Sequence, residues 1–475
     1  MVHHRIRSIV RYLGVPVLTL ALSDARFGYG QDSQQNPQNP TLQELKEKLQ
    51  NIEREMNEVQ DQIKALEGAK PAPAPVAPQL PEGNAEQHAA EATVEPVKAG
   101  LGTMQIYGFA QMDSGYNFGQ IDPLWFDTMR PTKLDAYKNE FAPNGTVFFS
   151  VRQSRFGVKT STPTNYGDLK TIFEFELFGT GVDAGQTTFR LRHAWGEIGQ
   201  IGAGQSWSPF MDIDVFPNSL EYWGPNGMVF FRNVQFRWMP IHRDNLQVWL
   251  AAERPGASAD GGVYADRIAI AGITPKFDMP DFSWRVRTSH EWGYVQVAGI
   301  FRKITWVATN PVPNYNIGDT VLGWGINTST NLKFTKKDNL KLQVVYGAGI
   351  ENYMNDAPID VGVKTNPSQP SRPLKGVALP VIGVVSFLDH DWNSKFSSTI
   401  GYSLLSMWNS NAENPADFHQ GDYALTNLLY YPVKNVMVGG EFQFGRRVNF
   451  SDGWNVNDYK LQLSAKFNFS RDFSY

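Results

Sequence analysis

The stretch VFFSVRQSRFGVKTSTPTNYGDLKTIFEFELFGTGVDAGQTTFRLRHAWGEIGQIGAGQS, residues 147–206, decides the fold. It consists of short alternating segments separated by turn residues, which is typical of antiparallel β-strands. The segment 169–178 shows the alternation best. Its odd positions form a mainly apolar face: Leu169, Thr171, Phe173, Phe175 and Leu177. Its even positions include charges: Lys170, Ile172, Glu174, Glu176 and Phe178. Successive side chains of a strand point to opposite faces, so this strand has one apolar and one polar face.

Two folds use such strands. In a soluble sandwich the apolar face packs on a second sheet, whereas in a membrane barrel it faces lipid and the polar face lines a water-filled lumen. The mean hydropathy of −0.35 is too low for a helical membrane protein. Beyond the N-terminus the chain has no apolar run of about 18 residues, the length that a transmembrane helix needs. The net charge of −4 gives no indication of nucleic-acid binding. We therefore predict an all-β transmembrane barrel of about 16 antiparallel strands in the bacterial outer membrane, as residues 103–475.

The predicted strands begin near Met104. Their ranges are 104–116, 147–160, 169–178, 188–198, 200–207, 229–239, 246–254, 265–277, 282–307, 322–334, 340–350, 377–388, 394–405, 422–431, 436–448 and 459–469. Short turns are expected at 240–245, 278–281, 335–339 and 431–435, and long loops near 117–145, 208–228, 308–320, 350–376, 408–421 and 449–457. Bacterial barrels alternate short periplasmic turns with longer external loops. We keep 282–307 as one strand, with a bulge near Gly293, because dividing it would invert this alternation downstream.

The N-terminus is predicted to be a secretory signal peptide, residues 1–25, followed by a spacer at 26–40. Basic residues precede an apolar stretch at 12–22 that is too short to span a membrane. Small residues place cleavage between Ala25 and Gly30. The alternative is a basic tail without a targeting role.

Residues 41–67 have a heptad pattern that predicts a periplasmic coiled coil. The a and d positions are Leu42, Leu45, Leu49, Ile52, Met56, Val59, Ile63 and Leu66. Their side-chain types do not decide between two and three strands. A Pro/Ala-rich linker at 68–102 separates this segment from the barrel, which favours self-association over the alternative of a helix docked on its own protein.

Arginine residues occupy alternating positions on several predicted strands. Each has apolar neighbours of the opposite parity, so it faces the lumen if those neighbours face lipid. The set comprises Arg155, Arg190, Arg192, Arg237, Arg285 and Arg287. A charge on the lipid face costs about 2–4 kcal/mol at the bilayer midplane, which favours the inward orientation. Guanidinium groups in a narrow polar pore attract anions and bind carboxylate or phosphate through two hydrogen bonds.

Glu174 and Glu176 share the polar face of the segment 169–178, and we expect them on the wall beside these arginines. Such a separation of charge would orient a dipolar solute. The alternative is an Arg–Glu network that only braces the wall, and the two roles can coexist.

The motifs RFGVK (155–159), GDLKTIFEFELFG (167–179), FRLRHAW (189–195) and GQSWSPF (204–210) resemble the trimeric porin superfamily. The order of signal peptide, heptad coil, Pro/Ala linker and barrel is similar to the DcaP-like outer-membrane transporters. That resemblance implies a sixteen-stranded barrel, a periplasmic coil, a homotrimer and a preference for small organic anions such as dicarboxylates. By motif, Arg155, Arg190 and Arg192 match pore-facing positions, whereas the other arginines rest on alternation alone.

The segment SPFMDIDVFPNSLEYWGPNGMVFF, residues 208–231, follows the fifth predicted strand. In porins the third loop folds inward and narrows the channel, and we expect this segment to do the same. Its constriction residues would be Asp212, Asp214, Glu221, Tyr222 and Trp223, with the three acids facing the arginine wall. The alternative is an external lid or a subunit latch.

We find no Ser–His, metal-protease or nucleotide-binding motif, and we expect no enzyme activity, no cofactor and no metal. The favoured function is passive diffusion of small hydrophilic solutes, with anions preferred. Alternatives are a sugar-type channel, for which Tyr222 and Trp223 are the clear support, a cation-preferring channel, a barrel enzyme such as a phospholipase, or a structural envelope tether. Expected partners are two further copies of the chain, outer-membrane lipid, small anions, and peptidoglycan or a periplasmic protein through the coil.

Overall fold

The computed structural model describes residues 54, 102–257, 272–309, 313–314 and 316–475. The predicted signal peptide (1–25), spacer (26–40), coiled coil (41–67) and linker (68–102) therefore lie, apart from Arg54 and Gly102, outside the described residues and stay predictions. Within the described part of the chain, no helix has the length and apolar character that crossing a membrane requires.

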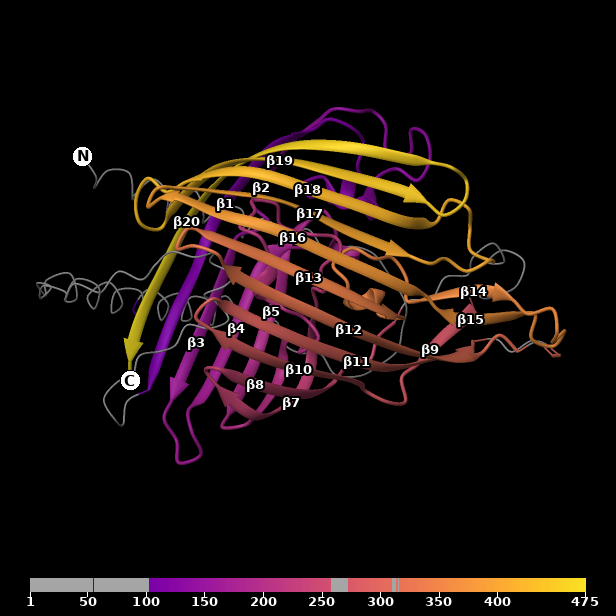
Figure 1. Ribbon diagram of the computed structural model, residues 1–475, viewed down its shortest axis with the longest axis horizontal. Coiled ribbons are helices and arrows are strands. Elements are labelled where there is room, and N and C mark those ends of the chain that lie inside the picture. The colour runs from indigo at the N-terminus through magenta and orange to yellow at the C-terminus, as the bar shows by residue number, and fades with distance from the viewer. Residues whose placement is uncertain (1–53, 55–101, 258–271, 310–312, 315) are drawn as a thin grey trace, which may run out of the picture. The chain divides into compact units, whose positions relative to one another are not determined.

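From Thr103 onward the described chain is almost entirely β-structure (Figure 1). The strands are β1 (Thr103–Asn117), β2 (Thr146–Ser150), β3 (Arg155–Thr162), β4 (Leu169–Phe178), β5 (Thr187–Ile198), β6 (Ile201–Trp207), β7 (Arg232–Arg243), β8 (Leu246–Glu253), β9 (Ile273–Lys276), β10 (Asp281–His290), β11 (Gly293–Ala308), β12 (Asp319–Lys333), β13 (Asp338–Ala348), β14 (Val361–Thr365), β15 (Leu374–Ala378), β16 (Pro380–Asn393), β17 (Phe396–Met407), β18 (Phe418–Tyr430), β19 (Val436–Asn449) and β20 (Asn455–Ser474). Short 3₁₀ helices are η1 (Pro123–Trp125), η2 (Pro131–Lys133), η3 (Gly181–Asp183), η4 (Ile213–Val215) and η7 (Glu351–Tyr353).

The sheet closes on itself because its first and last strands pair. β1 and β20 form an antiparallel ladder from Thr103↔Ser474 to Asn117↔Lys460, and β20 also pairs with β19. Two strands are interrupted: β2 and β3 both pair with β1, and β9 and β10 both pair with β11. The described residues thus form a closed antiparallel barrel of sixteen strands, as predicted, with β14 and β15 as a separate hairpin.

Successive connections lie at alternate ends of the barrel. At what we call the turn end they have two to six residues: 163–168, 199–200, 244–245, 291–292, 334–337, 394–395 and 431–435. At the loop end all but the five-residue connection 450–454 are longer: 118–145, 179–186, 208–231, 254–272, 309–318, 349–379 and 408–417. The β14–β15 hairpin belongs to the connection 349–379 and lies beyond the barrel at the loop end (Figure 1).

The prediction that 282–307 is one strand is wrong. β10 ends at His290 and β11 begins at Gly293, and these residues pair across a two-residue turn. The predicted turn 278–281 is also wrong, because β9 lies in line with β10 along β11 and the two form one interrupted barrel strand. Residues 265–271 of the predicted strand 265–277 lie outside the described residues, and β9 falls within its described part. Dividing 282–307 adds a strand and joining β9 to β10 removes one, so the strand count is still sixteen.

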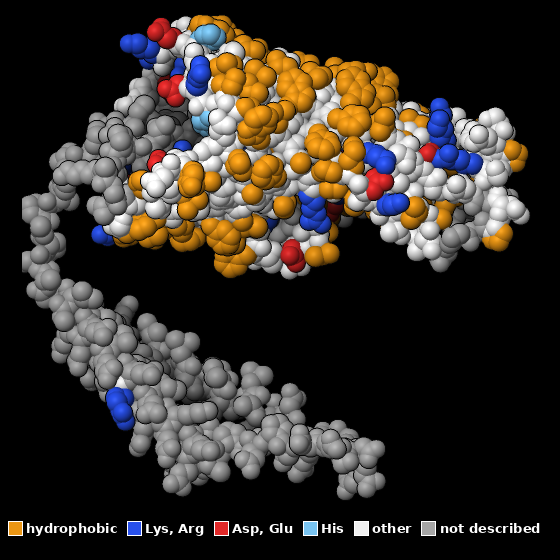
Figure 2. All heavy atoms as spheres, turned by 90° about the horizontal axis from the view of Figure 1, so that it is seen from below, with side chains coloured by type: hydrophobic (Ala, Val, Ile, Leu, Met, Phe, Trp, Pro, Cys, Tyr) orange, Lys and Arg blue, Asp and Glu red, His pale blue; other side chains and the backbone are white. Residues whose placement is uncertain are grey.

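The outer surface of the barrel is apolar, and Figure 2 shows hydrophobic side chains over much of the visible face. On β4, Phe173 is 50% exposed while Glu174 is fully buried inside the barrel. The outward residues include Phe156, Phe236, Trp238, Leu250, Trp284, Phe301, Trp324, Tyr346, Ile400, Leu428, Phe442, Leu461 and Phe467. This arrangement is the inverse of a soluble protein and suits a lipid-facing barrel.

Loops fill part of the interior. The connection 208–231 packs inside the barrel, where the side chains of Phe210, Met228 and Val229 are completely buried. They belong to one apolar cluster with inward residues of β13, β16 and β17, such as Val381 and Leu405. Burial of this apolar surface fixes the connection against that side of the wall.

The β10–β11 turn gives a test of this topology. Gly293 has φ +132°, and a Cβ atom there would lie 1.9 Å from the carbonyl oxygen of Asn331. We predict that Gly293→Ala destabilises the folded barrel by about 1–3 kcal/mol through backbone strain, measured by urea unfolding in detergent. Gly196→Ala in β5 is the matched control, since its added Cβ meets nothing within 4 Å. Equal urea concentrations at the midpoint of unfolding for the two variants would contradict the assigned turn.

Candidate functional site

The inner face of β3, β4, β5 and β7 carries a cluster of charged side chains around Glu174 and Glu176. Arg192 donates from Nε to Glu174 and from Nη1 to Glu176, each at 2.6 Å. Arg155 lies 3.8 Å from Glu174 and 3.6 Å from Glu176, and Arg190 and Arg232 lie 3.5 and 3.6 Å from Glu176. We call these six residues the glutamate–arginine cluster.

An irregularity in β5 brings Arg192 between the two carboxylates. Glu174 pairs with His193 and Phe175 pairs with Leu191, so Arg192 is an additional residue in the ladder. Both Arg192 and His193 are consequently buried inside, whereas strict alternation would have sent one of them to lipid. A bulge of this kind re-aims a side chain within a strand.

Tyrosine hydroxyl groups also donate hydrogen bonds to the two glutamates. Tyr107 of β1 donates to Glu174 at 2.6 Å, and Tyr222 of the inward connection donates to Glu176. The ring of Tyr222 stacks on Phe178 with centroids 3.9 Å apart. The cluster thus holds four guanidinium groups and two carboxylates, a formal excess of positive charge in a largely buried position.

The inward connection is also tied to the opposite edge of the arginine wall, at Arg287 of β10. Arg287 binds Asp212 at 2.5 Å and Asp214 at 2.6 Å. Asp212 in addition accepts hydrogen bonds from Tyr294 at 2.7 Å and Ser329 at 2.5 Å. The structure therefore places both aspartates against an arginine of the wall, in direct ion pairs rather than across an open gap.

Glu221 lies elsewhere. Its carboxylate accepts the backbone N–H of Met129 at 3.0 Å and that of Gly224. Burial raises the pKa of Glu221 to about 7, against the opposing attraction of Lys460 on β20. The expectation that it faces the arginine wall is not met, because the following turn directs it toward β20.

Trp223 forms part of an aromatic contact with the loop 118–145. It packs edge-on against Trp125 at 4.7 Å, and the guanidinium carbon of Arg130 lies 4.1 Å from the centroid of each ring. Its indole N–H donates to the carbonyl of Asn355 at 2.6 Å. These contacts connect three loops, so Trp223 is not an isolated aromatic surface for a sugar.

Arg237 and Arg285 form a second arginine group, nearer the turn end. Both contact the ring of Trp249 on β8, with guanidinium carbons 4.3 and 3.2 Å from its centroid. Arg237 also lies 4.5 Å from the ring of Trp195. All six predicted arginines are on the inner wall, but the structure separates them into the glutamate–arginine cluster, the Arg287 ion pairs and this tryptophan-bound pair.

Sequence reasoning missed further inward arginines, among them Arg152, Arg232, Arg302 and Arg447. Arg302 alternates with outward Phe301, so parity could have found it, whereas Arg232 shares the parity of outward Val234 and Phe236, which strict alternation assigns to lipid. Arg302 binds Asp281 at 3.0 Å and Asp360 at 2.7 Å. Arg152 binds Asp127 at 2.6 Å, and no strand pattern could have found it because both residues lie in irregular segments.

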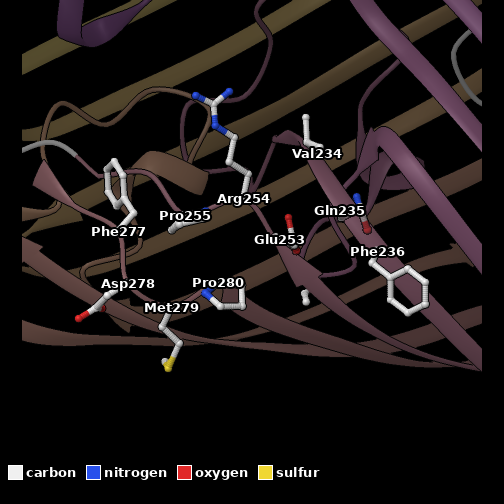
Figure 3. Close-up of a pocket in the computed structure, with 11 residues that line it drawn as sticks. Val234, Gln235, Phe236, Glu253, Arg254, Pro255, Phe277, Asp278, Met279 and Pro280 are labelled. Atoms are coloured by element: carbon white, nitrogen blue, oxygen red, sulfur yellow. The ribbon is translucent and has the colours of Figure 1, made fainter.

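A hollow of about 460 Å³ lies at the interruption between β9 and β10 (Figure 3). Phe236, Phe277, Met279 and Pro280 give it a mainly apolar lining. In the described part of the chain, no group of three or more His, Cys, Asp or Glu residues is placed to hold a metal ion. The charged groups of the barrel interior are therefore the candidate functional site.

Comparisons with known proteins agree with this architecture. The family model described as DcaP outer membrane protein matches residues 82–469. The solved outer membrane channel DcaP of Acinetobacter baumannii superposes with a TM-score of 0.64 at 19% identity, covering 78% of this chain and 99% of that one. The anion-selective porin from Comamonas acidovorans superposes with a TM-score of 0.50 at 9% identity, covering 78% of this chain and 100% of that one.

These two structural likenesses show the shared barrel fold. No curated protein sequence matches the chain at a significant level. The family model, however, covers most of the chain, including the whole region from β1 to β19. The chain therefore belongs to the DcaP outer membrane protein family and is an outer-membrane porin.

Proposed function

We propose that this porin favours small organic anions such as dicarboxylates, and that its arginine wall and the connection 208–231 form the constriction. The glutamate–arginine cluster carries this proposal, since four guanidinium groups surround only two carboxylates there. Arg190 is the most accessible of the paired arginines, with a side chain 29% exposed. Its planar guanidinium group can donate two parallel hydrogen bonds to a carboxylate of a passing solute.

An acidic group across the interior from Arg287 supports a transverse separation of charge. Glu441 of β19, seven strands around the barrel from β10, is almost fully buried inside the barrel. Glu441 accepts the backbone N–H groups of Leu220 and Glu221, so the inward connection is anchored to this side as well. A solute between the two sides would be oriented with its anionic group toward the arginines.

The proposal predicts anion selectivity in a planar bilayer. Under a KCl gradient, the reversal potential of the purified protein should indicate preference for chloride over potassium. Arg190→Gln should reduce that preference, because it removes one accessible positive charge and leaves Glu176 less compensated. The double variant Arg190→Ala with Arg192→Ala should abolish it.

Lys303→Gln is the matched control for this measurement. Lys303 has outward parity on β11 and pairs with Asp278 at 2.8 Å, so its charge does not face the lumen. Its reversal potential should equal that of the unmodified protein. Cation preference in the unmodified protein would mean that the acids dominate the constriction, and the proposed solute class would be wrong.

The Arg287 ion pairs predict that Asp212 holds the inward connection in place. Asp212→Asn removes the charge that binds Arg287 at 2.5 Å and weakens its bonds with Tyr294 and Ser329. We expect a loss of about 1.5–3 kcal/mol in unfolding free energy, together with noisier single-channel current. The exposed Asp183→Asn is the control. Quiet, unchanged current in Asp212→Asn would show that the connection does not depend on this pair.

We further propose that the chain assembles as a homotrimer and that residues 41–67 reinforce the assembly from the periplasm. The support is the heptad pattern of that segment. A 41–67 peptide should form trimers in analytical ultracentrifugation. Its remaining monomeric at high micromolar concentration would count heavily against this role. Deleting 41–67 from the full chain should leave conductance intact if the segment serves only assembly or tethering.

A further inference from the structure

We infer that Arg237, Trp249 and Arg285 form a separate binding site for a single carboxylate group of a transported organic anion. We call it the tryptophan–arginine site. The inference rests on the proposed function and deepens it, because it identifies which part of the arginine wall holds the solute. It also gives the interior two successive anion-attracting positions rather than one.

The site is built on adjacent strands. Trp249 of β8 pairs directly with Arg285 of β10, and Arg237 of β7 pairs with Ala251, two residues along β8 on the same face. The ring of Trp249 therefore lies between two inward guanidinium groups, whose carbon atoms are 3.2 and 4.3 Å from its centroid. Contact with an aromatic face orients a guanidinium group without using its hydrogen-bond donors.

The two arginines lack the carboxylate partners that every other predicted arginine has. Across the described residues, neither Arg237 nor Arg285 has a carboxylate oxygen within 4.0 Å. In the described part of the chain, Arg285 hydrogen-bonds only to the amide oxygen of Gln247, at 2.6 Å. Arg237 binds the amide oxygen of Gln235 and the carbonyl of Trp207.

Burial makes this lack of compensation costly. Arg285 is 9% exposed and Arg237 is 3% exposed, so water does little to stabilise their charges. The nearest acids, Glu197 and Glu253 for Arg237 and Asp212 and Asp214 for Arg285, influence them only at longer range. Asp212 and Asp214 are in addition engaged by Arg287. A buried, uncompensated cation is typical of a site at which a ligand supplies the counter-charge.

Unused donors point to the same conclusion. The Nε–H of Arg285 and the indole Nε1–H of Trp249 are buried and have no hydrogen-bond partner among the described residues. The Nη1 groups of Arg237 and Arg285 make no hydrogen bond with any described residue. The site thus contains more N–H donors than acceptors. An incoming anion with planar, paired oxygen acceptors would correct that imbalance, and a carboxylate has this geometry.

The position of the site suggests the order in which a solute would meet the two groups of arginines. β5 runs from the loop end to the turn end, with Arg190 and Arg192 preceding Trp195. Trp195 adjoins Arg237, so the tryptophan–arginine site lies beyond the glutamate–arginine cluster in the direction of the turn end. A solute that enters at the loop end would pass the compensated arginines first and the uncompensated pair second. Weak binding at more than one place favours permeation, because a solute can leave each place easily.

The test is current block by succinate, added to a bilayer that contains the full-length protein in KCl. Arg285→Gln should raise the half-blocking succinate concentration about tenfold or more, as expected for loss of a charge-assisted hydrogen bond. Arg285→Lys should retain chloride preference but still lose most of the block, because it keeps the charge and lacks the planar fork. Arg243→Gln, which removes an exposed charge at the turn end of β7, should leave the block unchanged.

The outcomes separate this inference from the proposed function. An unmodified channel without anion preference would overturn both. An anion-preferring channel whose succinate block is the same in Arg285→Gln, Arg285→Lys and the unmodified protein would overturn the tryptophan–arginine site alone. Equal weakening by Arg243→Gln would also overturn it, since the effect would then be general electrostatics. If Arg285→Gln does not fold, Trp249→Phe decides: it should weaken the block about threefold by removing the indole donor, and an unchanged block would refute the site.

Discussion

The structure depends on one constraint, which is that backbone N–H and C=O groups cannot remain unpaired in hydrocarbon. A sheet meets it only by closing, and here β1 and β20 pair along fifteen residues from Thr103↔Ser474 to Asn117↔Lys460. Closure then assigns the side chains of each regular strand by parity to lipid or to the interior. Phe173 and Glu174 are neighbours in sequence, yet one faces outward and the other is buried in a charged network. The barrel has a polar interior because the pairing of its backbone hydrogen-bond groups requires a closed sheet, and closure gives each strand an inner and an outer face.

A second constraint acts inside, where loops occupy part of the barrel and limit access of water. Buried charges there require partners, and Glu176 shows how they are supplied: arginines of β3, β5 and β7 and the hydroxyl of Tyr222 converge on it. The inward connection is held by the same rule, with Asp212 bound to Arg287 on one side and Leu220 bound to Glu441 on the other. Apolar packing of Phe210 and its neighbours secures the segment between those two anchors.

Period-two alternation explains why so much of the barrel could be predicted from sequence. It identified six of the inward arginines and the inward Glu174 and Glu176, since parity survives errors of several residues in strand ends. It failed where a turn or bulge changes parity without changing composition. The Glu291–Trp292 turn contains no Pro, Asn or Asp, and only Gly293 marks it, so 282–307 looked continuous. The extra residue at Arg192 and the direction of Glu221 depend on local backbone geometry that alternation does not encode.

Charge compensation is the property that the sequence could not supply, and it changes how the arginine wall should be interpreted. Counting arginines gives greatest weight to the region around Arg190 and Arg192, where the motif is densest. In three dimensions Arg192 is the most completely paired, through two bonds of 2.6 Å to two glutamates, and its charge is largely committed to the wall. Arg285 was predicted to face inward from alternation alone, and its only hydrogen bond among the described residues goes to a neutral amide. An anion gains most where a buried cation has not already been neutralised, so the capacity to bind a solute follows the unpaired charge rather than the number of arginines.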